Sequence, residues 1–255
     1  LKELYVETLD PTLLDVVKAR EERKLQSTYL TPRVAPYGRL VYSVNPVGTK
    51  TARHTSGQTI VILAPSKKKR RKAKTGTNAQ TIPRIVREAI IPDPGMVLFY
   101  ADLRQVEDRI VAYAGGVKKK IHAFETGINA HSLSAAGYFN CTVEDVEREK
   151  EECKKRYVEP PMYYIGKQGN HAFNYGEGPR TFKTNFNKKV DETGIKITEA
   201  QAKAIRQKHL KLYPEIEYGY WAWIKETLLT KRMRLTNPFG YERVLYGNPK
   251  DDRTF

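Results

Sequence analysis

The sequence predicts an α+β protein. Short segments rich in β-branched and aromatic residues fall in the first hundred positions, and the rest of the chain carries mostly helical patterns. Since 40% of the 255 residues are apolar, the chain can build a core, which excludes wholesale disorder. The longest apolar runs, such as Ile60–Ala64, fall far short of the roughly 20 residues that span a bilayer, and no charged-then-apolar leader opens the sequence. We therefore expect neither membrane insertion nor Sec-type export.

The first hundred residues predict one helix and two strands. Asp10 suits an N-cap and Pro11 the first helical position, so a helix is expected from there to about Gln26, with its apolar end facing a core. The segment Leu40–Asn45 has the composition of a strand. The run Met96–Tyr100 follows a turn-forming Pro-Asp-Pro-Gly and predicts a buried strand that ends at Asp102.

The second part of the chain predicts long helices. They are expected at 142–157, at 198–212 and at 218–233, the last with both tryptophans. Thr198 and Gln201 have the spacing of a capping box, which marks the start of the second of these helices.

The charge predicts a polyanionic partner. A formal net charge of +16 attracts nucleic acid by default, but leaves open an enzyme on DNA, a passive binder and a ribosomal protein. Seven of the nine residues at 66–74 are Lys or Arg, which fits either a solvated loop or a loop that contacts phosphates. Cys141 and Cys153 stand in no metal-binding or redox spacing and are expected to be free thiols.

Two segments carry residues suited to chemistry on nucleotides. Asp102, at the end of the predicted strand, could ligate a metal or simply cap a helix. Lys167, His171 and Tyr175 are four residues apart, so a helix would place them on one face, where they could hold a triphosphate and stack on a base. The plainer alternative is a packed helix with an extended lysine.

Five stretches, taken in order, make the sequence specific. They are "RKLQSTYL" from Arg23, "TKTARHTS" around Arg53, "TNAQTIPRIVREAI" around Gln80, "ADLRQVEDRIVAY" from Ala101 and "GKQGNHAFNYG" from Gly166. Together they resemble the motifs of family-A DNA polymerases of bacterial and phage type. The resemblance runs from about Arg23 to about Tyr246.

This resemblance implies a right-hand polymerase fold, with a palm sheet, a helical fingers subdomain and part of a thumb. The expected divisions are a thumb-to-palm segment at 1–30, a partial palm at 31–115 with a basic insertion at 65–76, helical fingers at 116–236, and a return to the palm at 237–255.

The resemblance also implies roles in nucleotide addition. Asp102 would hold catalytic Mg²⁺ together with the backbone carbonyl of Leu103. Lys167 would bind the triphosphate of the incoming dNTP, and His131 would reach its β-phosphate. Tyr175 would complete the catalytic group.

Further residues are assigned by the same resemblance. Glu107, with Tyr175, would exclude a ribose 2′-hydroxyl, and Arg109 would brace the helix that carries Glu107. Gln105 and His171 would also contact the nucleotide. Primer-template DNA would meet five residues, namely Lys24, Ser27, Thr28, Arg53 and Gln80; a plain surface or capping role is the alternative for Arg53 and for His131.

The sequence departs from the family pattern at several positions. Tyr163 stands where an arginine precedes the fingers lysine, and His171 replaces an aromatic Phe or Tyr. Arg104 replaces a serine, Ala52 replaces a glycine, and the basic insertion lengthens a short link.

The chain begins with Leu1, and no His-Asp motif follows residue 240, so the second metal-binding carboxylate is missing from these residues. We therefore expect part of a larger or split polymerase, completed by a C-terminal portion or a second subunit and acting at the nucleoid in the cytoplasm of a bacterial or phage-infected cell. A non-catalytic DNA-binding subunit of polymerase shape is the alternative. A single-subunit RNA polymerase is disfavoured because Glu107 would obstruct a ribonucleotide.

Overall fold

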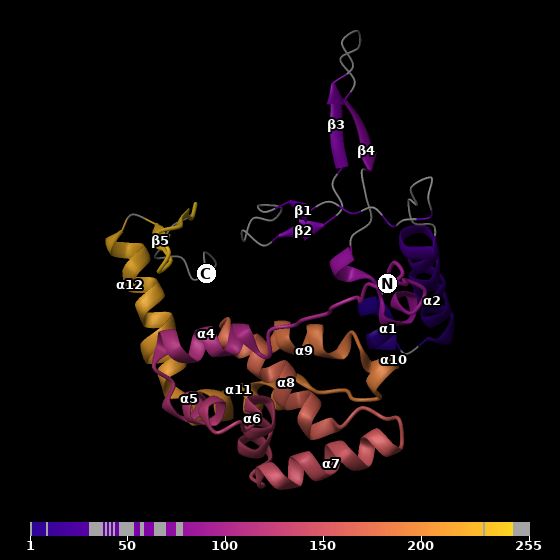
Figure 1. Cartoon of the computed structure of the whole chain (residues 1–255). Coiled ribbons are helices and arrows are strands. Elements are labelled where there is room, and N and C mark those ends of the chain that lie inside the picture. Colours follow the sequence, from indigo (N-terminus) through magenta and orange to yellow (C-terminus); the bar gives the residue numbers. More distant parts are fainter. Residues whose placement is uncertain are drawn as a thin grey trace. The chain divides into compact units, whose positions relative to one another are not determined.

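The computed structural model describes residues 2–8, 10–30, 38, 40, 42, 44–45, 54–56, 59–63, 70–74, 79–231 and 233–246. The chain forms two compact units, Leu1–Ala101 and Asp102–Phe255 (Figure 1). None of the helices in these described ranges is long and apolar enough to cross a membrane.

Helices open the first unit. They are α1 (Lys2–Thr8), α2 (Pro11–Leu25) and the π-helical turn η1 (Gln26–Leu30). The expected cap of α2 is confirmed, since the Asp10 side chain accepts a hydrogen bond from the Thr12 N–H at 2.8 Å. Val17 is buried on the inner face of α2, whereas Val16 is 40% exposed. The apolar end of the helix therefore covers a core with part of its surface only.

Two antiparallel strand pairs follow. β1 (Val44–Asn45) pairs with β2 (Thr55–Ser56), which confirms the end of the strand expected at Leu40–Asn45. β3 (Thr59–Leu63) pairs with β4 (Arg70–Lys74), so the prediction of a loop is wrong for the second half of the basic segment. The physical reason is that a two-stranded ribbon satisfies the backbone of β4 through the apolar β3, while long basic side chains tolerate an edge strand. Residues 64–69 lie outside the described residues.

The strand predicted at Met96–Tyr100, near the end of the first unit, is not found. After η2 (Ala79–Thr81) and α3 (Arg84–Arg87), residues 96–100 run as irregular backbone and not as a buried strand. Val97 and Phe99 are 88% and 90% exposed. A strand needs hydrogen-bonding neighbours, and within the described ranges no strand pairs with this segment. Within the described residues, the ring of Tyr100 contacts the Arg87 guanidinium, which lies 4.7 Å from the ring centroid.

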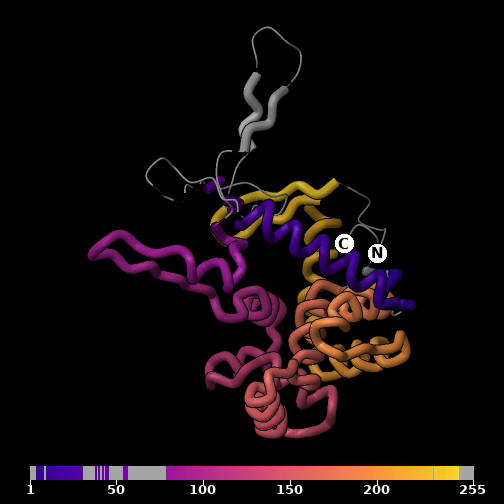
Figure 2. Tube along the Cα trace, turned by 90° about the vertical axis from the view of Figure 1, so that its right-hand side faces the viewer, coloured from indigo at the N-terminus to yellow at the C-terminus, as the bar shows by residue number. Residues whose placement is uncertain are grey.

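The second unit is helical up to residue 230. In chain order it contains α4 (Val106–Gly115), α5 (Lys118–Glu125), α6 (Ala130–Phe139), α7 (Val143–Lys155), α8 (Pro161–Asn174), α9 (Pro179–Asn187), α10 (Val190–Thr193), α11 (Glu199–Leu212), the π-helical η3 (Ile216–Trp221) and α12 (Ala222–Thr230). β5 (Arg234–Thr236) and β6 (Glu242–Val244) follow as an antiparallel ribbon, drawn in yellow in Figure 2.

Helix starts in this unit obey local signals. Thr142 and Asp145 form a complete capping box at α7, and Thr198 and Gln201 form one at α11, which confirms both expected helices. The helix expected at 218–233 is found as η3 and α12. The π-helical start was not predicted from the sequence.

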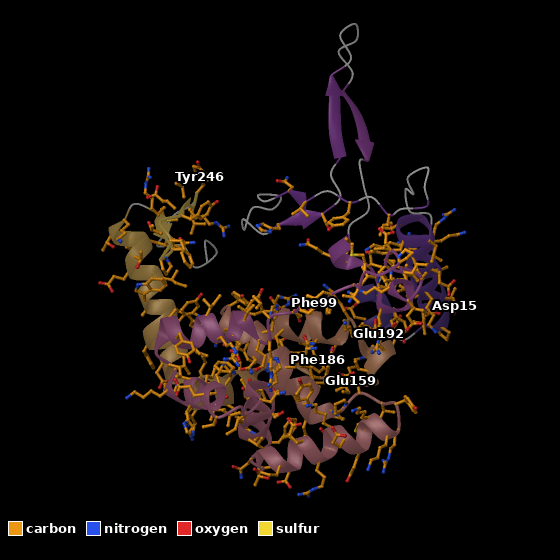
Figure 3. All side chains as sticks on the ribbon, in the orientation of Figure 1. Asp15, Phe99, Glu159, Phe186, Glu192 and Tyr246 are labelled. Atoms are coloured by element: carbon orange, nitrogen blue, oxygen red, sulfur yellow. The ribbon has the colours of Figure 1, made fainter. Side chains whose placement is uncertain are left out.

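The core of the second unit is aromatic. Phe173 of α8 packs against Phe182 of α9 with ring centroids 4.6 Å apart, and Phe186 lies among the same helices (Figure 3). α6 and α8 pack closely because Gly166 has no side chain: a Cβ there would strike the His131 carbonyl oxygen and, at 2.8 Å, the Ala135 Cβ. This close approach brings His131 against α8.

Candidate functional site

A cavity of about 380 Å³ lies in the second unit, between the start of α4, the start of α6 and one face of α8. Its lining consists of Leu103, Gln105, Val106, Glu107, Asp108, His131, Lys167, Gln168, Asn170, His171, Asn174 and Tyr175. Polar groups from three helices therefore converge on one space, which is typical of a ligand site.

The face of α8 carries the expected row of residues. Lys167, His171 and Tyr175 all line the cavity, and Tyr175 is the C-cap of the helix. The rings of His171 and Tyr175 meet edge to face with centroids 5.5 Å apart. The helical spacing read from the sequence is confirmed, because each of the three side chains reaches the same space.

Glu107 faces this row from α4. Its Oε2 accepts a hydrogen bond of 3.0 Å from the Tyr175 hydroxyl and lies 3.7 Å from His171 Nδ1. Glu107 and Tyr175 are therefore in direct contact between the first turn of α4 and the end of α8, while their expected joint role toward the sugar stays a prediction.

Gln105 and His131 are placed by one asparagine. Asn129, the N-cap of α6, accepts hydrogen bonds of 2.9 Å from Gln105 Nε2 and from the His131 N–H. Gln105 has a left-handed backbone with φ of 52°, a conformation that costs a non-glycine residue energy and is held here at the N-terminus of α4. The bend turns its side chain toward α6.

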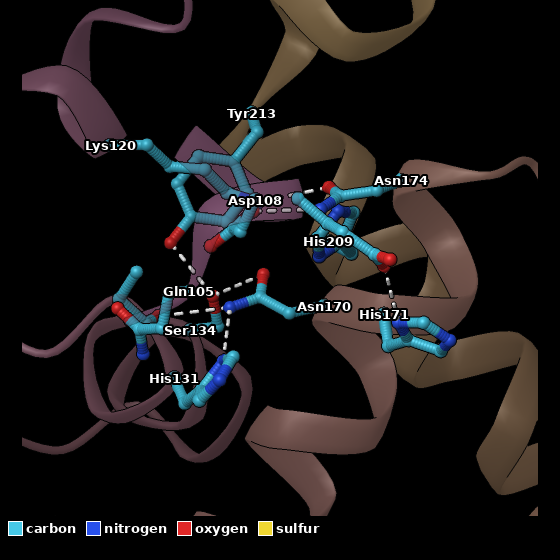
Figure 4. Close-up of polar contacts among 12 residues, drawn as sticks. Gln105, Asp108, Lys120, His131, Ser134, Asn170, His171, Asn174, His209 and Tyr213 are labelled. Atoms are coloured by element: carbon cyan, nitrogen blue, oxygen red, sulfur yellow. Dashed lines mark hydrogen bonds and ion pairs between the residues drawn. The ribbon is translucent and has the colours of Figure 1, made fainter. Parts of the chain in front are cut away.

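A buried chain of hydrogen bonds orients His131. Tyr213 and Ser134 share a hydrogen bond of 2.9 Å, and the Ser134 hydroxyl donates to Asn170 Oδ1 at 2.8 Å (Figure 4). Asn170 Nδ2 in turn donates to the Ala130 carbonyl and lies 3.2 Å from His131 Nδ1.

This network selects one form of the imidazole. Because Asn170 Oδ1 is already an acceptor, Nδ2 is the donor, and His131 Nδ1 must accept. Burial lowers the pKa of His131 to about 4, with the nearby Lys167, Lys120 and His171 adding to the effect and Asp108 opposing it. His131 is therefore neutral at pH 7 and carries its proton on Nε2.

An ion pair lies beneath the cavity. Lys120 Nζ is 2.6 Å from Asp108 Oδ1 and donates to Asn174 Oδ1 at 3.0 Å (Figure 4). Lys120 is fully buried, and this burial lowers its pKa against the opposing pull of Asp108. The second Asp108 oxygen, Oδ2, is buried without a hydrogen-bond partner.

Sequence reasoning missed two groups of residues around the cavity: the half-buried Asn129, and a buried set that comprises Asp108, Lys120, Ser134, Asn170, Asn174 and Tyr213. The available signal was spacing: Asn170 and Asn174 follow the same four-residue period as the exposed row, one helical position before it.

The whole-chain comparisons decide the family. The model of DNA polymerase family A matches residues 1–246. The chain belongs to DNA polymerase family A. Polymerases of this family generally use divalent metal ions.

Two curated relatives of this family-A chain are bacterial polymerases. It is 27% identical over 247 residues to thermostable DNA polymerase I of Thermus aquaticus, covering 93% of this chain and 24% of that protein. It is 28% identical over 182 residues to DNA polymerase I of Chloroflexus aurantiacus, covering 66% of this chain and 17% of that protein. The chain thus spans about a quarter of the length of the Thermus relative.

A solved structure shares the fold. The POL domain of Pol1 from M. smegmatis, in a complex with DNA primer-template and dNTP, matches with a TM-score of 0.69 and 20% identity over 98% of this chain and 39% of that one. The predicted α+β polymerase fold is confirmed. The expected subdomain boundaries stay predictions.

The remaining expected residues of the family-A chain lie outside the cavity or at its edge. Asp102 is exposed in irregular backbone and is not part of the lining, whereas Leu103 is. Among the described residues, no three His, Cys, Asp or Glu side chains cluster as a metal site. Arg109 fits a bracing role, because its Nε donates to the Arg104 carbonyl at 3.2 Å and its guanidinium lies 4.5 Å from the Phe124 ring centroid.

The expected DNA-contacting residues belong to the first unit. Lys24 lies in the last turn of α2, and Ser27 and Thr28 lie in η1. Gln80 is exposed, and its N–H donates to Ser56 Oγ at 3.2 Å. Arg53 lies outside the described residues, as does the Ala52 departure.

Tyr163 stands in place of a family arginine and has its own partners. Its ring meets His131 edge to face at 6.1 Å, and Lys150 Nζ lies 4.7 Å from its centroid. Lys150 also pairs with Glu147 at 2.9 Å, and Glu147 accepts from Ser132 at 2.5 Å. The tyrosine thus packs a ring beside His131 where the family places a charge.

Proposed function

We propose that this chain binds primer-template DNA and a dNTP and takes part in template-directed DNA synthesis, in which a nucleotide is transferred to a primer 3′-hydroxyl. The observation that carries the proposal is the cavity in which Lys167, His131 and the Glu107/Tyr175 pair face one another across α4, α6 and α8. These groups suit the three parts of a dNTP: its phosphates, its sugar and its base.

The phosphates of the dNTP would be held by a cation and a neutral donor. Lys167 offers an ammonium group on the exposed face of α8. His131 offers Nε2–H, because its Nδ1 faces Asn170. Phosphoryl transfer depends on well-placed positive charges and hydrogen-bond donors more than on covalent catalysis by the protein. Lys167 can supply such a charge, and His131 can supply such a donor.

The sugar would meet the Glu107/Tyr175 pair. A carboxylate held by a phenol leaves little room for a 2′-hydroxyl, so this pair would favour a deoxyribose. His171 and Tyr175 present ring edges and faces to the same space, where the base can stack.

Magnesium would be held by oxygen atoms before α4. The Asp102 carboxylate is exposed, and the Leu103 carbonyl accepts a long 3.4 Å hydrogen bond from the Val106 N–H, so both oxygens are suitable hard ligands. Bound Mg²⁺ would supply charge stabilisation to the transferring phosphoryl group. Asp102 and Leu103 would orient it beside the cavity. The need for a second carboxylate from a C-terminal portion or second subunit stays a prediction.

DNA binding follows from charge and from the first unit. The net charge of +16 favours a phosphate backbone, and Lys24, Ser27, Thr28, Gln80 and Arg53 are the proposed contacts. Action at the bacterial nucleoid would follow from this function.

The experiment is primer extension with the 255-residue chain, alone and joined to a family-A C-terminal portion. We expect the joined form to add nucleotides in the presence of Mg²⁺. Asp102→Asn should abolish this addition and leave duplex binding nearly unchanged, since it removes a metal ligand and not a backbone contact. Asp191→Asn in α10, which does not line the cavity, is the matched control.

Two results would overturn the proposal. Near wild-type extension by Asp102→Asn would refute the metal site. DNA binding without any extension by the joined form would favour the non-catalytic subunit. The chain alone is expected to bind primer-template DNA without adding a nucleotide.

A further inference from the structure

Three side chains form a buried polar cluster beneath the cavity. Asp108 of α4, Lys120 of α5 and Asn174 of α8 are 6%, 0% and 3% exposed. Asp108 Oδ1 is 2.6 Å from Lys120 Nζ and accepts a 2.7 Å hydrogen bond from Asn174 Nδ2. Lys120 Nζ also donates to Asn174 Oδ1 at 3.0 Å. Each of the three residues thus contacts the other two.

This cluster lies directly behind the proposed sugar-sensing pair. Asp108 follows Glu107 in α4, and Asn174 precedes Tyr175 at the end of α8. Two hydrogen bonds therefore join the first turn of α4 to the end of α8, and we call them the inner link and the outer link. The inner link runs from Asn174 Nδ2 to Asp108 Oδ1, and the outer link runs from the Tyr175 hydroxyl to Glu107 Oε2 at 3.0 Å.

The two links differ in environment. Tyr175 is 54% exposed, so water competes for the outer hydrogen bond. The inner link is shielded from water and is charge-assisted, which makes it the stronger of the two. The separation of α4 and α8 is therefore set from inside, and the outer pair adopts the spacing that results.

Lys120, which belongs to α5, also connects the cluster to the end of α11. Its Nζ lies 4.6 Å from the ring centroid of Tyr213, which begins the hydrogen-bonded chain to Ser134 and Asn170. The ammonium group thus contacts two oxygen acceptors and one aromatic face, and its full burial keeps water from competing for these contacts. A lysine held in this way has one position, which fits a role in fixing geometry.

We infer that Asp108, Lys120 and Asn174 are positioning residues for deoxynucleotide selection: they hold Glu107 and Tyr175 in contact at the sugar-binding end of the cavity. The inference rests on the proposed function, since it assumes that the Glu107/Tyr175 pair meets the sugar. A cluster that serves only to stabilise the fold would leave selection between deoxyribose and ribose unchanged.

The test measures a ratio of affinities. dCTP and CTP compete, with Mg²⁺, for the 255-residue chain bound to a primer-template whose primer ends in a dideoxynucleotide and whose next template base is guanine. Asn174→Leu removes both hydrogen bonds of the asparagine at similar volume. Asn187→Leu is the control, because Asn187 is also fully buried and makes two 2.9 Å hydrogen bonds, to the backbone of Ile197 and away from the cavity.

We expect Asn174→Leu to lower the preference for dCTP about tenfold, the size of effect of one hydrogen bond to a charged group. Asn187→Leu should destabilise the fold and leave the preference unchanged. Asp108→Asn removes the charge of the inner link but retains an oxygen acceptor at Oδ1, so it should lower the preference less than Asn174→Leu does. Should Asn174→Leu not fold, Asn174→Ser replaces it, because a serine is too short to reach Asp108 and should show the same loss.

A double substitution separates the inference from the proposed function. In a Glu107→Ala chain, which should already have lost the preference, Asn174→Leu should lower it no further. If Glu107→Ala lowers the preference and Asn174→Leu does not, or if the two effects simply add, the positioning role is refuted while the proposed function stands. If Glu107→Ala leaves the preference unchanged, the proposed sugar site and the inference fail together.

Discussion

Acid should destabilise the second unit through His131. Its pKa in the folded chain is about 4, below the ordinary 6.5, so the folded state binds fewer protons than the unfolded state between these values. The contribution of the neutral His131 side chain to the free energy of unfolding is complete above pH 6.5 and is lost as the pH falls to about 4. This interval, at about 1.36 kcal/mol per pH unit, amounts to about 3 kcal/mol of unfolding free energy.

The measurement is urea unfolding from pH 7 to pH 4 for the wild type and for His131→Gln. Trp221 and Trp223, the two tryptophans of the chain, both lie in the second unit and report its unfolding by fluorescence. Burial also lowers the pKa of His209 well below its ordinary value, but this histidine is present in both proteins. The difference between the two curves therefore isolates His131. Parallel curves would refute the assignment of a neutral, buried imidazole.

Three further predictions concern charge and stability. Lys120→Met should lower the unfolding free energy by about 3–5 kcal/mol, because Asp108 would remain buried and unpaired, and a loss below about 1 kcal/mol would contradict the buried ion pair. Thr198→Ala should cost about 1 kcal/mol in the same urea assay by removing the capping box of α11, while no loss would mean that the cap is replaced by water. Replacing the seven basic residues at 66–74 with neutral ones should flatten the plot of log DNA affinity against log salt by roughly 0.9 per lost phosphate contact, and an unaltered slope would make this segment a solvated insertion.

Local signals in the sequence were sufficient to place the starts of α2, α7 and α11. Asp10 with Pro11, Thr142 with Asp145, and Thr198 with Gln201 act within one turn, so their effect does not depend on the rest of the fold. The strand expected at residues 96–100 failed for the opposite reason. A strand depends on partners that are distant in sequence, and an apolar run alone does not supply them.

In the candidate site, too, the features set by local geometry could be predicted, and those set by contacts between distant residues could not. Lys167, His171 and Tyr175 could be placed on one face because helical spacing is fixed by local geometry. The buried ion pair could not be foreseen, since Asp108 and Lys120 are twelve residues apart on different helices. In addition, Asp and Lys are residue types that usually lie at the surface. Only the packing of α4, α5 and α8 makes them partners.

The most direct test of the account is dNTP binding at the cavity itself. Titration of a dNTP with Mg²⁺ into the 255-residue chain can be followed by the fluorescence of Trp221, whose Nε1 donates to the Asn174 carbonyl at the end of α8. We expect saturable binding that Lys167→Ala weakens at least about tenfold, as loss of a charge-assisted hydrogen bond should. Lys203→Ala, an exposed lysine on α11, should leave it unchanged. Equal weakening by both variants, or binding unaffected by Lys167→Ala, would contradict the claim that this cavity is the nucleotide site.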